Sequence, residues 1–245
     1  MRQFLSPRLL PYISFTAGLL TAGGMGLLHT AGEDAQGLFP ATHIGWILAC
    51  LIAAVGLALV ACLSWGLGGK FRYRKLFAPS GSAAAGTFAA AIGFAVSGIA
   101  DITGHGDIYG TVCGFSCVIS AVALLFLAYC SRTGQRPAYF IRSTVTVSLM
   151  LRLICRFRHW TDPQLETYLF PLLASVFLML ACYHRTTLDA DECSRRAYVF
   201  TSQAAVILCF GAVFSDSWLF YLTAALWMGL DIPNLRPAKK TAQKD

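Results

Sequence analysis

The chain has 245 residues, of which 56% are hydrophobic and 13% are charged, and its formal net charge is +7. Soluble domains contain about 25% charged residues, so this composition excludes an ordinary soluble globular protein. The basic balance does not indicate a nucleic-acid-binding protein, because the cations collect in short loops beside apolar runs rather than on one folded basic surface.

The apolar runs predict an all-α protein, a polytopic transmembrane helical bundle. Each run is near the roughly 20 residues that a helix needs to cross the hydrocarbon of a bilayer. The strands of a membrane barrel would instead alternate in hydropathy over about 10 residues, whereas these runs are continuously apolar. In chain order the predicted helical segments are 9–28, 43–67, 81–100, 109–129, 138–155 and 167–183, followed by a longer apolar region at 197–230.

The first and the last apolar regions each allow two interpretations. Residues 9–28 follow a basic start and could be a cleaved signal peptide, but His29 stands where a cleavage site needs a small residue, which favours an uncleaved helix. Residues 197–230 are too long for one ordinary span and are broken at 215–217. We expect two short helices with a tight turn there, with re-entrant halves as the alternative. The chain then has about eight spans, or seven if the last region is one helix.

The loops between the runs alternate in charge. Residues 70–75 carry four cations, while the next polar break, 101–107, carries two acids and neither lysine nor arginine. Because basic loops stay in the cytoplasm, the pattern predicts consecutive in–out–in hairpins with both termini cytoplasmic. It also predicts a single integral membrane domain over 1–245 that ends in a basic cytoplasmic tail, 235–245. The expected location is a cell membrane, either a plasma membrane or a bacterial inner membrane.

The fifth run departs from this pattern because arginines lie inside it. A guanidinium at the bilayer centre costs about 2.5–3.5 kcal/mol on insertion scales. Arg142 and Arg156 are near the two ends and can snorkel to water, but Arg152 lies about one turn further in and needs a partner or a water-filled pocket. The candidate substrate-binding residues are Arg152, Arg156, Glu166, Asp162 and Asp101, with Asp216 as a further acid from a neighbouring hairpin.

These charges support two interpretations. They could form a salt-bridged lock between helices, or an outward-facing site for a carboxylate, phosphate or other anion, which a guanidinium fork recognises. The leading functional hypothesis is binding or transport of a small solute, with an anion favoured, through an arginine-containing pocket. The alternative is a non-transporting membrane subunit or sensor whose basic cytoplasmic loops recruit a partner. A membrane-embedded enzyme without a local motif is the third hypothesis.

Catalytic and metal-binding signatures are missing from the sequence. It contains no Walker loop, GxSxG elbow, HExxH or CxxC motif, so we predict no catalytic residue, no cofactor and no metal ligand. Cys113 and Cys117 are four residues apart and could hold a metal, but no histidine or cysteine stands at a fixed spacing from them. The cysteines are therefore expected to be packing residues.

Small residues recur at four-residue steps along the third run, from Gly81 to Ser97. Such a stripe lets a second helix backbone approach closely, which favours tight packing or dimerisation over a lining for a pathway. The expected partners are the lipid bilayer, a small solute and no nucleic acid. A second copy of the chain could pack through the small-residue faces at Gly93, Ala89 and Gly23.

Overall fold

A computed structural model describes residues 2–30, 43–65, 79–104, 108–157, 165–190 and 194–232. These residues contain eight α-helices and no β-strand, which confirms the all-α prediction. The helices are α1 (Arg2–Thr30), α2 (Ile44–Trp65), α4 (Gly81–Gly104), α5 (Ile108–Thr133), α6 (Tyr139–Phe157), α7 (Leu165–Asp189), α8 (Arg195–Gly211) and α9 (Trp218–Asp231), with a 3₁₀ turn, η1 (Ala212–Phe214), between the last two.

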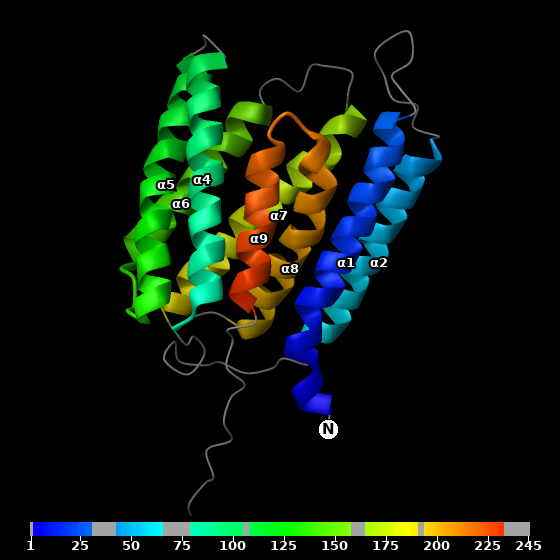
Figure 1. Cartoon of the computed structure of the whole chain (residues 1–245), viewed down its shortest axis with the longest axis horizontal. Helices are drawn as coiled ribbons and strands as arrows, with labels where there is room; N and C mark the ends of the chain where they lie inside the picture. Colours follow the sequence, from blue (N-terminus) through cyan, green and yellow to red (C-terminus); the bar gives the residue numbers. More distant parts are fainter. Residues whose placement is uncertain are drawn as a thin grey trace, which may run out of the picture.

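Successive helices run in opposite directions, and the helices lie side by side in one bundle (Figure 1). Helices α1 and α2 form one side, α4 and α5 the other, and α7, α8 and α9 lie between them. Helix α6 packs against α5 and α7, while α4 packs against α9 and α1 against α8. We call the end where α4 ends and α9 begins the upper end, and the end where α7 ends and α8 begins the lower end (Figure 1).

Among the described residues, five segments are long and apolar enough to cross a membrane, which supports a membrane protein. Helix α9 has 14 residues and is shorter than these spans, and α6 is more polar because it carries three arginines. The final apolar region divides where its sequence predicted, since α8 ends at Gly211 and α9 begins at Trp218. The five segments are Ile44–Trp65, Gly81–Gly104, Ile108–Thr133, Tyr168–Asp189 and Arg195–Phe214.

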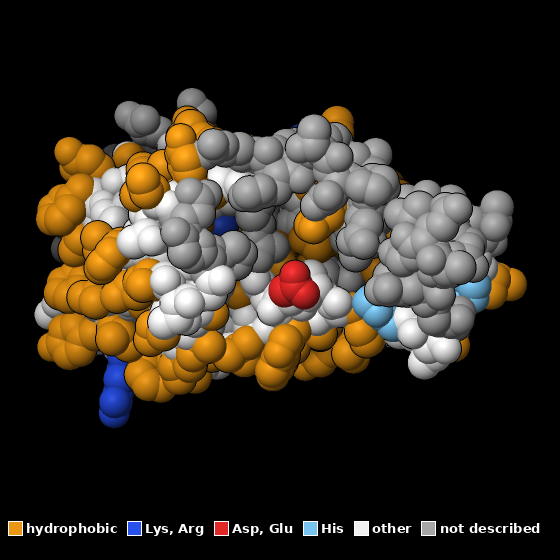
Figure 2. All heavy atoms as spheres, turned by 90° about the horizontal axis from the view of Figure 1, so that it is seen from above, with side chains coloured by type: hydrophobic (Ala, Val, Ile, Leu, Met, Phe, Trp, Pro, Cys, Tyr) orange, Lys and Arg blue, Asp and Glu red, His pale blue; other side chains and the backbone are white. Residues whose placement is uncertain are grey.

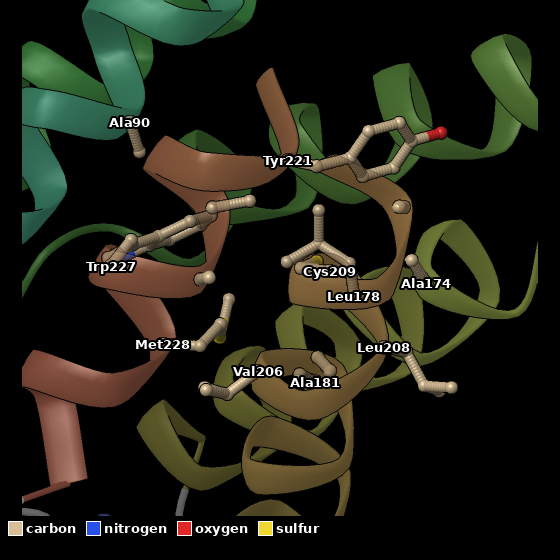
Figure 3. Close-up of a cluster of buried hydrophobic side chains, with 14 of the residues drawn as sticks. Ala90, Ala174, Leu178, Ala181, Val206, Leu208, Cys209, Tyr221, Trp227 and Met228 are labelled. Atoms are coloured by element: carbon tan, nitrogen blue, oxygen red, sulfur yellow. The ribbon is translucent and has the colours of Figure 1, made fainter. Parts of the chain in front are cut away.

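Helix α8 is the centre of the bundle. Val206, Leu208 and Cys209 are buried on different faces of this helix, and Figure 3 shows them between side chains of α7 and α9. This helix is surrounded because it packs against α1, α2, α7 and α9. The outer helices instead expose large apolar side chains such as Leu51 and Val122, as expected where lipid is the solvent.

Small residues bring the helices of this one chain close together. A Cβ added to Gly98 of α4 would lie 2.7 Å from the carbonyl oxygen of Gly114 in α5. Gly93 is likewise covered by Thr223 of α9, whereas Gly23 faces open space and Ala89 is half-buried. Of the residues proposed for contact with a second copy, Gly93 therefore already packs within the chain.

The small-residue stripe of α4 does not stay on one face of its helix. Gly81 and Ala85 are exposed, Ala89 is half-buried, and Gly93 and Ser97 are buried. A helix has 3.6 residues per turn, so each four-residue step moves the stripe about 40° around the helix. The stripe thus winds from the outer surface into the bundle before it reaches the upper end.

Candidate functional site

Arg152 of α6 is almost completely enclosed at the upper end, with 1% of its side chain exposed. Its Nη1 donates a hydrogen bond to Oδ2 of Asp101 at 2.8 Å, and its Nη2 donates to Oγ of Ser217 at 3.0 Å. The guanidinium also lies 4.4 Å from the ring centroid of Phe220. The predicted need for a partner is therefore met by α4 and by the start of α9.

The guanidinium is not fully satisfied by these contacts. Its Nε has no hydrogen-bond acceptor among the residues that the structure describes. Asp101 differs from Arg152 because 17% of its side chain is exposed. Within this ion pair, the carboxylate of Asp101 is therefore partly accessible from the upper end, whereas the guanidinium of Arg152 is enclosed.

Two thiols complete this upper site. Nη1 of Arg152 lies 3.7 Å from Sγ of Cys117, and the hydroxyl of Ser148 donates to the same sulfur at 3.8 Å. The ligand atoms of Asp101, Cys113 and Cys117 all lie within 4.8 Å of one another. The local spacing of the two cysteines did not predict this group, because its third member belongs to the other helix of the hairpin.

The remaining predicted site residues are only partly covered by the structure. Arg156 lies in the last turn of α6 and Glu166 in the first turn of α7, but their side chains lie outside the described part, and Asp162 lies outside the described residues altogether. Asp216 is exposed in the turn before α9. Figure 2 views the upper end, where hydrophobic side chains dominate the described surface and an acidic side chain is exposed among them.

A second group of charges lies at the lower end and was not predicted. Nε of Arg142 is 2.8 Å from Oδ2 of Asp189, and Nη1 of Arg185 donates to Oδ2 of Asp231 at 2.6 Å. Arg185 also lies 3.8 Å from Asp189, and the hydroxyl of Tyr198 donates to Asp231. All five side chains are buried. We call Arg142, Arg185, Asp189, Tyr198 and Asp231 the lower charge cluster.

The expectation that Arg142 snorkels to water is wrong, since this side chain is buried and paired with Asp189. The apolar pattern ended the sixth run at residue 183, whereas α7 continues to Asp189. The sequence prediction therefore left Arg185 and Asp189 outside the sixth helix. A usable signal was present, because Arg185 and Asp189 are four residues apart and such pairs meet on one helix face.

Polar side chains line the contact between α5 and α6 along the length that separates the two charged groups. The hydroxyls of Ser116 and Ser148 are 3.2 Å apart, and the hydroxyl of Ser120 donates to the carbonyl oxygen of Thr144 at 3.5 Å. We call these four residues the polar seam. It runs from near the Arg142 end of α6 toward the Arg152 end; Ser120 and Ser148 are buried, whereas Ser116 and Thr144 are half-buried.

The chemistry available at the upper site is anion recognition by a guanidinium and cation binding by two thiols and a carboxylate. Comparisons with protein-family models, with curated proteins and with solved structures find no match for this chain.

Proposed function

We propose that this protein binds a small anionic solute at Arg152 and carries it across a cell membrane. The observation that carries the proposal is the asymmetry of the Arg152–Asp101 pair. The base is enclosed and keeps a buried Nε without an acceptor among the described residues, while the acid is partly exposed. Ionisable side chains inside a membrane bundle commonly mark the paths of solutes and ions.

In this account Asp101 occupies the place of the solute when no solute is bound. A guanidinium has five N–H donors and binds carboxylate or phosphate through two parallel hydrogen bonds. Asp101 and Ser217 each accept one hydrogen bond from the terminal nitrogens. An anion that enters from the upper end can displace Asp101 and accept hydrogen bonds from Nη1 and Nη2 together, which a single Asp101 oxygen does not do.

The route across the bundle follows α6. The polar seam leads away from Arg152, and the lower charge cluster lies at the opposite end of the same helix. The charges of the two arginines and the two aspartates in that cluster sum to zero. Its ion pairs can therefore form, to close the lower end, and separate, to open it, without a change in the cluster's net charge. The upper site and the lower cluster would then be the two gates of an alternating path.

The proposed topology has eight spans, both termini in the cytoplasm and the lower end inside. Basic residues concentrate on the cytoplasmic side of membrane proteins. The described arginines near the lower end support this orientation, and they are Arg132, Arg136, Arg142, Arg185, Arg195 and Arg196.

A non-transporting membrane subunit is the second candidate, and the lower charge cluster favours it. Its charges are buried and paired within the chain, which is also what a lock between α6, α7 and α9 requires. In that case the Arg152–Asp101 pair would be a second lock, and no anion would compete for the guanidinium.

Uptake into proteoliposomes tests the proposal. The purified chain is reconstituted, and radiolabelled phosphate, sulfate and succinate are offered separately. We expect the wild type to take up at least one of these anions. The initial rate of uptake by Arg152→Gln should be at least tenfold lower. Arg132→Gln is the matched control, because it makes the same chemical change at an exposed position and should leave uptake unchanged. Absence of uptake of all three anions, or equal uptake by Arg152→Gln, contradicts the proposal.

A further inference from the structure

We propose that Asp101, Cys113 and Cys117 bind one soft divalent cation of the Zn²⁺ class between α4 and α5. This inference goes beyond the proposed solute function and does not depend on it. The ligand atoms of the three residues already lie within 4.8 Å of one another. Tetrahedral Zn²⁺ with Zn–S bonds of about 2.3 Å holds its sulfur ligands about 3.8 Å apart. Shifts of roughly 1 Å would therefore bring the three side chains into coordination.

The backbone of the hairpin brings these ligands together. Cys113 and Cys117 are four residues apart, so both face the same side of α5. Asp101 follows Gly98 by three residues on α4, and Cys117 follows Gly114 by three residues on α5. A Cβ on Gly114 would lie 2.5 Å from the carbonyl oxygen of Gly98. Only glycine at both positions allows the two helices to approach this closely and lets a carboxylate of one meet the thiols of the other.

The charges select a divalent cation. Two thiolates and one carboxylate carry three negative charges, and a divalent cation together with Arg152 supplies three positive charges. Arg152 is in place for this role, since its Nη1 lies 2.8 Å from Asp101 and 3.7 Å from Cys117. Net charge in a low-dielectric interior is costly, so a neutral assembly is favoured. A monovalent cation would leave one negative charge uncompensated.

The ligand chemistry selects a soft metal. Thiolates prefer zinc-like and softer ions over magnesium or calcium, which prefer oxygen. Asp101 has two carboxylate oxygens, so one can stay with Arg152 while the other coordinates, and ligating carboxylates commonly have such a hydrogen-bonded partner. The partly exposed side of Asp101 at the upper end provides the entry, and the fourth position is left for water or another ligand.

Cys209 is a buried cysteine that does not belong to the proposed metal site. Cys209 is buried among apolar side chains of the α7–α9 region (Figure 3). Within the part of the chain that the structure describes, the Asp101 group is the one set of three histidine, cysteine, aspartate or glutamate side chains that gathers in this way. Cys209 is therefore a matched control, because its replacement removes a buried thiol without touching the proposed ligands.

Cd²⁺ binding to the full chain tests the inference. The protein is purified in detergent, reduced, stripped of metal and titrated with Cd²⁺, whose bonds to thiolates absorb in the ultraviolet. We expect one Cd²⁺ per chain with thiolate absorption, and displacement of that Cd²⁺ by added Zn²⁺. Cys113→Ala and Cys117→Ala should each abolish the band, while Cys209→Ala should keep it. Arg152→Gln should weaken binding about 10- to 100-fold, as loss of a hydrogen-bonded partner of a ligand does.

Three results would overturn the inference: no thiolate band in the wild type, a band that persists in Cys117→Ala, or an equal loss in Cys209→Ala. If the alanine variants do not fold, Asp101→Asn decides, because it keeps both thiols and should weaken Cd²⁺ binding at least tenfold. Unchanged affinity in that variant contradicts the site. Anion uptake by the wild type is measured without added metal, so the solute proposal and the metal inference can fail separately.

Discussion

Arg152 of α6 and Asp101 of α4 form a 2.8 Å ion pair, although 51 residues separate them in the chain. Their two helices both pack against α5, so the pair ties the upper ends of three helices together. The same guanidinium reaches Ser217 before α9 and Cys117 within α5. One side chain thus connects α4, α5, α6 and the start of α9, which is why changes at Arg152 are expected to affect binding and stability together.

The lower charge cluster predicts a large loss of stability when one partner is removed. Arg142→Met leaves the carboxylate of Asp189 buried beside fewer positive charges, and breaking a buried pair in this way costs about 3–5 kcal/mol. Thermal unfolding in detergent measures the effect. The exposed Arg132→Met should change the free energy of unfolding by less than about 0.5 kcal/mol.

The double variant Arg142→Met with Asp189→Leu tests whether the cost comes from the unpaired charge. Replacement of a buried ion pair by apolar residues of similar volume is often neutral or stabilising, so the double variant should recover most of the loss. A double variant as unstable as the sum of both single variants would contradict this explanation.

Replacement by alanine should have opposite effects on stability at Gly93 of α4 and at Gly23 of α1. At Gly93 an added Cβ meets the side chain of Thr223, and overpacking of this kind typically costs 1–3 kcal/mol. At Gly23 the added Cβ meets open space, so Gly23→Ala should gain up to about 1 kcal/mol from helix propensity. The two midpoints of thermal unfolding should therefore move in opposite directions. A loss of stability in both variants would show that Gly23 is covered, for example by a second copy of the chain.

Replacement of Gln203, in the centre of the bundle, by an apolar residue should stabilise the protein. Its side chain is fully buried on α8, and neither its amide nitrogen nor its amide oxygen has a hydrogen-bond partner among the described residues. An unsatisfied buried polar group costs about 1–3 kcal/mol, so Gln203→Leu, which keeps a similar volume, should raise the unfolding midpoint. Gln203→Ala is the control, because it removes the amide and leaves a cavity. A lower midpoint for Gln203→Leu would show that the amide is hydrogen-bonded.

Hydropathy predicted the helices well because it is a local property of the sequence. The predicted segment 109–129 corresponds to α5 (Ile108–Thr133), and the break at 215–217 separates α8 from α9. The need of Arg152 for a partner was also predictable, since an isolated guanidinium is costly at that depth. Asp101 was among its candidate partners because both residues lie near the same predicted end of the bundle.

The contacts between helices could not be predicted in the same way. Whether Cys117 meets Asp101, or Asp231 meets Arg185, depends on how each helix is rotated about its axis and on which helices are neighbours. Glycine pairs such as Gly98 and Gly114 set those distances, and one sequence does not reveal which glycines face each other. Arg185, Asp189 and Asp231 were left outside the predicted helices because α7 and α9 extend beyond the apolar runs at 167–183 and 197–230.

The central claim is that an anion competes with Asp101 for Arg152, and its most direct test is the anion dependence of thermal unfolding. The wild type, Asp101→Asn and Arg152→Gln are compared with increasing phosphate, sulfate or succinate at constant ionic strength. A ligand that binds the folded state stabilises it by about 2.7 kcal/mol at 100 times its Kd. We predict that one anion raises the midpoint of the wild type, raises that of Asp101→Asn at lower concentration because the competing carboxylate is gone, and leaves that of Arg152→Gln unchanged. A wild type that responds to none of the three anions, or an equal response in Arg152→Gln, would contradict the claim.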